Sequence, residues 1–295
     1  MKKTIGFIGL GAMGSRMVRN LVGSADLVVY DTDAARTQEV ATAVAGMAAS
    51  SLADFAAATS VVLMLPTSQV VDVVVRGAAG QQGLFDILPK GAVVIDMSSS
   101  EPTRSVENAQ IAKEKGLTFI DAPVSGGIGG AAAASLAIMV GGSEAEFAAS
   151  RDLLARMGAK IVHAGPVGSG HAIKALNNLL SATIFAATAE VFAVGAKFGL
   201  DPKMMLEVID ASSGTSFHTK HVWQKSVIER NFNFGFAMEL MEKDVRVAKS
   251  LITAIGSEPP VSNAAALVWA QALKAAPAGA DMSVLARLTE EATGV

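Results

Sequence analysis

A short apolar run passes directly into a glycine-rich turn in the segment Thr4-Ile5-Gly6-Phe7-Ile8-Gly9-Leu10-Gly11-Ala12-Met13-Gly14. The segment predicts a strand over Thr4–Ile8 and a helix from about Ala12 to Val22, with a G-x-G-x-x-G turn between them. A strand, this turn and a helix in that order are typical of a dinucleotide-binding fold. The motif is weak alone, because a chain with 28 glycines can produce it by chance.

Each glycine of this turn has a physical role in such a fold. The first allows the tight turn, the second lets a pyrophosphate approach the backbone, and the third packs helix against strand. Asp31 ends the second apolar run, where an acidic residue binds the ribose hydroxyls of NAD and repels the extra phosphate of NADP. Arg36 weakens that inference slightly. We therefore predict NAD, with NADP less favoured, bound by Gly9, Leu10, Gly11, Ala12, Met13, Gly14 and Asp31. The alternative is a glycine turn that binds no nucleotide.

The first half of the chain alternates short β-branched runs with helical segments, which predicts a doubly wound parallel sheet, a Rossmann fold. The expected strands are Thr4–Ile8, Leu27–Tyr30, Val61–Leu65, Ala92–Asp96, Thr118–Asp121, Ala137–Val140 and Lys160–His163.

Strand signals almost vanish after the glycine-rich segment Gly165–Gly170. A helix over Gly170–Lys197 follows, and then helices near Pro202–Ala211, His218–Arg230, Met238–Ile255, Ser262–Lys274 and Ser283–Thr293. We predict an NAD-binding domain over residues 1–165 and an all-α domain over 166–295, joined by the long interdomain helix. The second domain is expected to serve substrate binding and oligomerisation.

Composition narrows the classes of function. The 295 residues are 51% hydrophobic and 17% charged, which excludes a disordered chain. The chain has no cysteine, so disulfides and thiolate metal sites are excluded. His218 and His221 have no third ligand at a useful spacing, so no metal is expected. The net charge of −3 without a basic run argues against nucleic acid.

The segment Leu176–Gly195 is the one candidate for a membrane span. It contains Asn177, Asn178 and Glu190, and charge is costly inside lipid, so we predict a buried helix and no membrane partner. The first strand begins without a cleavable leader pattern, which favours a cytoplasmic protein.

Three further segments are expected to reach the cofactor or the substrate. Leu65-Pro66 and Ser98–Ser100 follow two of the strands, and ligands bind at the carboxyl ends of strands in such sheets. The serines could also cap the next helix. The loop Asp121-Ala122-Pro123-Val124-Ser125-Gly126-Gly127 offers small residues with N–H groups suited to an anion, although it could be an ordinary glycine-rich loop.

Lys174 and Asn178 stand four residues apart on the long apolar helix and therefore share one face. A lysine there can have its pKa lowered towards neutrality and act as an acid/base. A lysine that reaches solvent, with Asn177 and Asn178 capping a neighbour, is equally compatible with the spacing. His171 precedes Lys174 by one turn and could touch substrate, although a histidine at the start of a helix is expected to face solvent. Trp223 and Trp269 are expected to be packing residues.

These motifs, in this order, resemble the β-hydroxyacid dehydrogenase family, in particular 3-hydroxyisobutyrate dehydrogenase and tartronate semialdehyde reductase, over essentially the whole chain. The resemblance rests on the segments Gly9–Gly14, Asp121–Gly127, Gly168–Asn178 and Lys243-Asp244. It implies a hydride transfer between NAD and a small carboxylate-bearing β-hydroxy acid or its semialdehyde, by a homodimer or homotetramer.

The resemblance also implies a role for each matched position. Lys174 and Asn178 fall on the catalytic lysine and its asparagine. Substrate-binding positions are Ser125, Gly126, Gly127, Asn177 and Phe236. Further cofactor-binding positions are Leu65, Pro66, Ser99, Lys243 and Asp244.

The chain departs from the family pattern near the substrate pocket, for example with Ser99 in place of threonine and at Phe232–Phe236, so the substrate stays open. A catalytically silent nucleotide sensor and an imine reductase are the alternatives.

Overall fold

The computed structural model describes residues 3–78 and 80–295. The chain divides into two compact units, Met1–Lys174 and Ala175–Val295, each described by itself below. The division lies inside helix α8 (Ser169–Phe198), whereas the sequence placed the domain boundary before that helix, at 165/166. Met1 and Lys2, at the start of the predicted first domain, lie outside the described residues.

The first unit is built on one large sheet. Its strand order is β11-β10-β8-β7-β4-β1-β2-β3, and β9 pairs with β10. The strands are β1 (Thr4–Ile8), β2 (Asp26–Tyr30), β3 (Met47–Ala48), β4 (Ser60–Leu63), β7 (Val93–Asp96), β8 (Thr118–Asp121), β9 (Val124–Ser125), β10 (Leu136–Gly141) and β11 (Gly158–Gly165). All seven predicted strands are present, with ends that differ by a few residues; β3 and β9 were not predicted.

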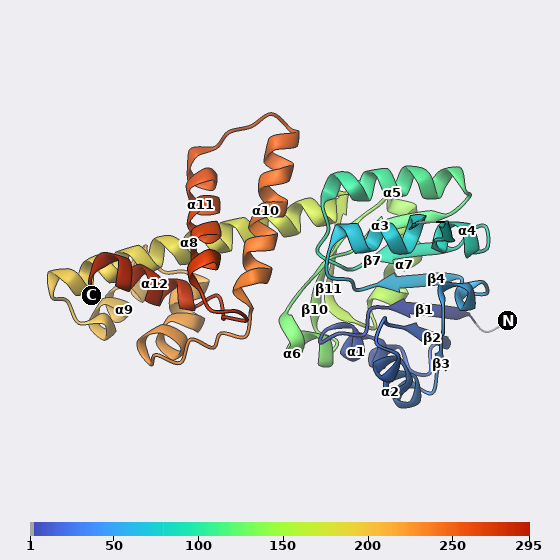
Figure 1. Ribbon diagram of the computed structural model, residues 1–295, viewed down its shortest axis with the longest axis horizontal. Helices are drawn as coiled ribbons and strands as arrows, with labels where there is room; N and C mark the ends of the chain where they lie inside the picture. The colour runs from blue at the N-terminus through green and yellow to red at the C-terminus, as the bar shows by residue number, and fades with distance from the viewer. Residues whose placement is uncertain (1–2, 79) are drawn as a thin grey trace. The chain divides into compact units, whose positions relative to one another are not determined.

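The run β3-β2-β1-β4-β7-β8 is parallel throughout, which confirms the predicted doubly wound fold. Helices cover both faces of the sheet, with α3 and α5 on one side and α1 and α2 on the other (Figure 1). Because both faces are covered, the central strands are buried and read as continuous apolar runs.

Strand β10 departs from the expected parallel pattern. It runs antiparallel to β8 and β9, and parallel to β11. The chain reverses between β9 and β10 through the segment that contains α6 (Gly127–Ala132), so the two strands pair as in a hairpin.

The other elements of the first unit are short connections and covering helices. They are α1 (Gly14–Met17), the 3₁₀ helix η1 (Val18–Leu21), α2 (Ala34–Val44), the 3₁₀ helix η2 (Leu52–Phe55), α3 (Ser68–Arg76), β5 (Gly77–Ala78), β6 (Gln81–Gln82), α4 (Leu84–Ile87), α5 (Pro102–Glu114) and α7 (Glu144–Leu154). The predicted helix Ala12–Val22 is thus shorter and tightens to 3₁₀ geometry, since Val18, Asn20, Val22 and Gly23 all favour the α-helix poorly.

The second unit is helical, as predicted. After α8 come α9 (Pro202–Asp210), η3 (Thr219–Ile228), α10 (Met238–Ala254), α11 (Pro260–Ala275) and α12 (Val284–Thr293). The segment η3 is a π-helix rather than an α-helix. Its buried pairs Val222–Trp223 and Ser226–Val227 recur every four residues, a spacing that is equally compatible with an α-helix.

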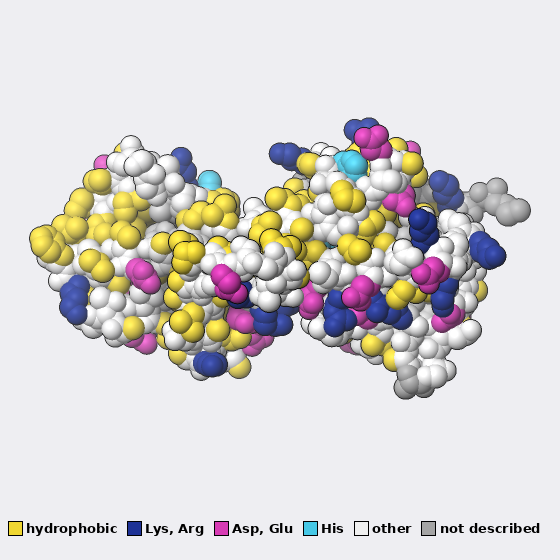
Figure 2. All heavy atoms as spheres, turned by 90° about the horizontal axis from the view of Figure 1, so that it is seen from above, with side chains coloured by type: hydrophobic (Ala, Val, Ile, Leu, Met, Phe, Trp, Pro, Cys, Tyr) yellow, Lys and Arg dark blue, Asp and Glu magenta, His cyan; other side chains and the backbone are white. Residues whose placement is uncertain are grey.

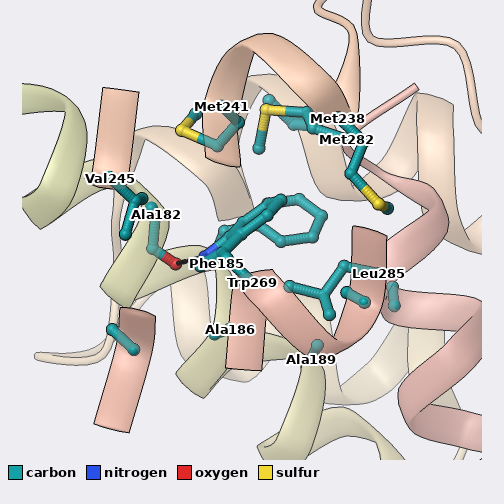
Figure 3. Packing of buried hydrophobic residues seen from close by; sticks show 14 of the residues in the cluster. Ala182, Phe185, Ala186, Ala189, Met238, Met241, Val245, Trp269, Met282 and Leu285 are labelled. Carbon is teal, nitrogen blue, oxygen red and sulfur yellow. Dashed lines mark hydrogen bonds between the residues drawn. The ribbon is translucent and has the colours of Figure 1, made fainter. Parts of the chain in front are cut away.

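Aromatic side chains fill the core of the second unit. Phe185 lies 5.2 Å from Trp223 and 6.1 Å from Trp269, between ring centroids. The indole of Trp269 donates a 3.0 Å hydrogen bond to the carbonyl oxygen of Ala182, and Met238 and Met241 close the cluster (Figure 3). Both tryptophans are fully buried, which confirms their predicted packing role.

Helix α8 is long and apolar enough to cross a membrane by length and composition alone. Core helices of other proteins pass the same test, and 44% of its most apolar window is buried. Phe185 and Phe192 on this helix belong to the core just described, as expected for a buried helix.

Candidate active site

In the glycine turn after β1, close packing requires glycine at two of the three motif positions and does not require it at the third. Gly9 has a φ of +94°, and a Cβ there would lie 2.2 Å from the carbonyl oxygen of Met64. A Cβ on Gly14 would lie 1.9 Å from the carbonyl oxygen of Gly9. A Cβ on Gly11 would meet no atom within 4 Å. Gly11 therefore faces open space, as required where a pyrophosphate approaches the backbone.

Asp31 at the end of β2 lies directly against this turn. Its Oδ2 accepts a 2.8 Å hydrogen bond from the N–H of Leu10, and its Oδ1 accepts one of 3.0 Å from Asp33. The guanidinium of Arg36 lies 3.6 Å from Oδ1. The structure thus brings the predicted acid to the predicted turn, and adds Arg36 as its neighbour.

A cleft of about 600 Å³ opens beside the turn. The guanidinium-bearing residues Arg16, Arg19 and Arg36 line it together with Gly11 and Ala12. Glu39 is the one carboxylate among the described lining residues, so the three arginines leave the cleft cationic, which suits an anionic nucleotide. The sequence reading did not use Arg16 and Arg19, although their spacing of three within one helical segment places them on one side.

The ends of β4 and β7 are tied together by a serine. The hydroxyl of Ser98, which is fully buried, accepts a 2.9 Å hydrogen bond from the N–H of Leu65. Asp96 accepts hydrogen bonds from the N–H of Ser98 at 3.0 Å and the hydroxyl of Ser100 at 2.8 Å. Next to these contacts Ser99 is half-buried and Pro66 exposed. Two predicted cofactor segments therefore form one connected edge.

The expectation that His171 faces solvent is wrong. Its side chain is 1% exposed, and its Nδ1 lies 2.7 Å from the Ser105 hydroxyl while its Nε2 lies 3.0 Å from the Ser98 carbonyl oxygen. The carboxylate of Asp121 accepts 2.7 Å hydrogen bonds from the N–H groups of Gly168 and His171. Ser98 and Asp121 come from the ends of β7 and β8 and Ser105 from α5, all distant in sequence, so the periodicity of one helix cannot predict these contacts.

The loop after β9 exposes its backbone. Ser125 is half-buried, and Gly126 and Gly127 are exposed with φ values of +133° and +61°. Side chains are strained in this backbone region, so glycine at both positions lets the loop adopt this exposed shape.

The predicted residues of the second unit meet in one polar cluster. The amide of Asn178, 7% exposed, donates a 2.5 Å hydrogen bond to Oδ2 of Asp244. Asn177 donates to the amide oxygen of Asn178 at 3.2 Å, and the ammonium of Lys243 lies 3.2 Å from Oδ1 of Asp244. Lys174, half-buried, is the last residue of the first unit and lies one turn before Asn178 on α8.

Phe236 lies in the segment that leads into α10. Its N–H and that of Gly235 donate to Oδ2 of Asp281, at 3.1 Å and 2.8 Å. Its side chain is partly buried against the core of the second unit. The aspartate therefore fixes the conformation of this predicted substrate-binding segment.

His218 is a core residue. Its ring packs edge-on against Phe185, and burial lowers its pKa although a hydrogen bond to the Ser181 carbonyl opposes the shift. Within residues 3–78 and 80–295 no three His, Asp or Glu side chains are placed to hold a metal ion.

Two family profiles match the chain in sequence. The NAD binding domain of 6-phosphogluconate dehydrogenase matches residues 4–165, and the NAD-binding family of NADP-dependent 3-hydroxyisobutyrate dehydrogenase matches residues 168–289. The chain belongs to the β-hydroxyacid dehydrogenase family. It is therefore an oxidoreductase of the NAD(P)-dependent β-hydroxyacid dehydrogenases, which act on a CH–OH group.

Full-length relatives support this membership in the β-hydroxyacid dehydrogenases. The 2-(hydroxymethyl)glutarate dehydrogenase of Eubacterium barkeri is 36% identical over 99% of this chain and 96% of its own. The NAD-dependent L-serine dehydrogenase of Pseudomonas aeruginosa is 34% identical over 99% of both chains. The solved structure of Mycobacterium tuberculosis 3-hydroxyisobutyrate dehydrogenase with L-serine is 33% identical, with a TM-score of 0.88 over 98% of this chain and 99% of its own.

Proposed function

We propose that this protein oxidises the alcohol of a small β-hydroxy acid with NAD, using Lys174 as the acid/base. The observation that carries the proposal is the polar cluster of Asn178 and Asp244, one turn from Lys174 on an otherwise apolar helix. A buried amide held by a carboxylate has a fixed orientation, which suits it to position a substrate oxygen.

The residues divide the chemistry between them. NAD, when bound, accepts the hydride that leaves the alcohol carbon. The amine of Lys174 accepts the hydroxyl proton in oxidation, and its ammonium returns the proton to the carbonyl oxygen in reduction. Asn178 positions that oxygen. Ser125 and the N–H groups of Gly126 and Gly127 bind the substrate carboxylate, and Phe236 with Asn177 borders the substrate.

The preference for NAD rests on Asp31. Its carboxylate lies against the glycine turn, where it can accept hydrogen bonds from ribose hydroxyls with its remaining lone pairs. The extra phosphate of NADP would meet this charge. Arg36, 3.6 Å away, offsets part of the repulsion, so the preference is expected to be strong but incomplete.

The proposed substrate is a small acid with a hydroxyl group on its β-carbon, for example as a hydroxymethyl group attached to the α-carbon. L-Serine belongs to this class, and it appears in the names of two of the relatives reported above. A panel of L-serine, 3-hydroxyisobutyrate, glycerate and 2-(hydroxymethyl)glutarate with NAD or NADP tests the proposal by the absorbance of the reduced nicotinamide. Turnover of at least one acid, faster with NAD, is expected.

Two outcomes of that panel would favour other functions. Cofactor binding without turnover of any acid would support the catalytically silent sensor. Reduction of a cyclic imine with no turnover of hydroxy acids would support an imine reductase. The presence of Lys174, Asn178 and Asp244 together supports the dehydrogenase over both.

A second copy of the chain is the proposed protein partner. Hydrophobic side chains gather on the surface of the second unit (Figure 2). On α8 the exposed ones are Leu176, Leu180, Val191, Val194 and Phe198, the last 83% exposed. A long apolar face of this kind suits burial against a second copy in a homodimer or homotetramer. Light scattering at micromolar concentration should give a dimer or tetramer mass; a stable monomer would contradict the assembly. A cytoplasmic location is proposed from the sequence, and cell fractionation tests it.

A further inference from the structure

His171 connects two parts of the first unit, the start of α8 and the segment after β7. The proposed reaction requires a fixed distance between these two parts. His171 lies on α8 three residues before Lys174. Because a carbonyl oxygen only accepts hydrogen bonds, Nε2 carries the proton and donates to the Ser98 carbonyl at 3.0 Å. On the other side of the ring, Nδ1 lies 2.7 Å from the Ser105 hydroxyl.

Ser98 extends this link to two strand ends. Its carbonyl receives the imidazole, while its hydroxyl receives the N–H of Leu65. Ser98 thus stands between the segment after β4 and the segment after β7, which carries Ser99. A shift of Ser98 would move both segments that we assign to the cofactor.

The backbone at the start of α8 is held separately. Oδ1 of Asp121 accepts from the N–H of Gly168 and Oδ2 accepts from the N–H of His171, both at 2.7 Å. The carboxylate therefore caps the helix from the end of β8, with the favourable interaction of an anion and a helix N-terminus. Loss of the His171 side chain leaves this cap in place, so the fold should survive the loss.

We propose that His171 is a positioning residue, whose Nε2–H bond to Ser98 sets the distance between the nicotinamide-side segment and Lys174. The inference rests on the proposed function, because it takes Lys174 as the acid/base and Ser99 as a cofactor neighbour. A shift of about 1 Å between reacting groups can cost as much as 10²-fold in rate. Loss of a single hydrogen bond that fixes this distance should therefore lower kcat.

Two substitutions of His171 distinguish the roles of its two ring nitrogens. The amide of glutamine reaches near the position of Nε2, so His171→Gln keeps a donor for the Ser98 carbonyl. The shorter amide of asparagine lies near Nδ1, so His171→Asn loses that donor. Ser105→Ala is the matched control, since it removes the partner of Nδ1 and leaves the Nε2 bond.

The readouts are kcat, the KM for the hydroxy acid, and the deuterium isotope effect on kcat with substrate labelled at the carbinol carbon. His171→Asn should lower kcat by about 10-fold or more and raise the isotope effect, because hydride transfer becomes slower than product release. His171→Gln and Ser105→Ala should stay within about 3-fold of the parent kcat with an unchanged isotope effect. A merely structural role would lower the active fraction and leave the isotope effect and KM unchanged.

Two results would overturn the inference. One is a His171→Asn enzyme with the parent kcat and isotope effect. The other is a fall in kcat for His171→Gln and His171→Asn alike, with no change in the isotope effect of either. Lys174→Ala distinguishes failure of the proposed function from failure of the positioning role. Full activity of Lys174→Ala contradicts the proposed function. Loss of activity in Lys174→Ala together with parent activity in His171→Asn contradicts the positioning role alone.

Discussion

The side-chain nitrogen of Asn178 lies 2.5 Å from Oδ2 of Asp244, so the carboxylate fixes which end of the amide faces it. A carboxylate only accepts hydrogen bonds, and the amide oxygen of Asn178 consequently turns away from it, towards the amide of Asn177. Two motifs that lie 66 residues apart in the sequence thereby form one structural unit.

Asp244→Asn should lower kcat by about 10-fold, because an amide at position 244 lets Asn178 reverse its orientation and loses the charged acceptor. The change conserves shape, so the melting temperature should fall little. Glu239→Gln on the exposed side of the same helix is the control and should have the parent kcat. Equal kcat values for Asp244→Asn and Glu239→Gln would contradict an orienting role for Asp244.

Gly11→Ala and Gly14→Ala should fail in different ways. A methyl group on Gly14 would lie 1.9 Å from a carbonyl oxygen, so this variant should lose about 1–3 kcal/mol of stability and several degrees in Tm. Gly11 has open space around it, so its variant should keep the parent Tm and bind reduced cofactor at least about 10-fold more weakly. Calorimetry and cofactor fluorescence measure the two effects. Normal cofactor binding by Gly11→Ala would show that the pyrophosphate does not approach there.

Asp31→Ser should reduce kcat/KM with NAD by about 10–100-fold and move the preference towards NADP, since the ribose acceptor and its negative charge disappear while the guanidinium of Arg36 remains. Asp33→Ser is the matched control: it removes a charge near Arg36, and serine still caps α2. That control should leave the ratio of the two kcat/KM values unchanged. A parent enzyme that prefers NADP would contradict the role assigned to Asp31.

His218 should make stability depend on pH. Burial lowers its pKa below the ordinary value of 6.5, so the unfolded chain binds the proton more readily than the folded one. The contribution of neutral His218 to the free energy of unfolding is fully present above pH 6.5. It is lost as the pH falls below 6.5. The drop in Tm between about pH 7.5 and about pH 5.5 should therefore be larger in the parent than in His218→Gln. Identical drops would show that this histidine does not titrate on unfolding.

Much of the fold could be predicted from periodicity and turn chemistry. Apolar runs such as Val93–Asp96 and the glycine turn gave the strands and the class of fold, because they depend on neighbours in sequence. The antiparallel β10 could not be predicted, since its direction depends on how the chain reverses near Gly126. The π-helix around Trp223 shares its four-residue spacing of buried residues with an α-helix.

The residues of the candidate site divide in the same way, into those that spacing in the sequence predicts and those whose contacts come from distant segments. The sequence placed Asp31 near Gly9–Gly14 by spacing alone, and the 2.8 Å contact with Leu10 agrees with that placement. It misplaced His171, because a histidine at the start of a helix is usually exposed and its partners Ser98 and Asp121 come from distant strand ends.

The most direct test of the account is kcat of Lys174→Ala on the best hydroxy acid of the panel. Loss of the acid/base should lower kcat by about 10²–10⁴-fold, while the affinity for reduced cofactor, measured by fluorescence, stays within about 3-fold of the parent. Lys160→Ala, an exposed lysine on β11, should keep the parent kcat. A Lys174→Ala enzyme that turns over at the parent rate would contradict the account.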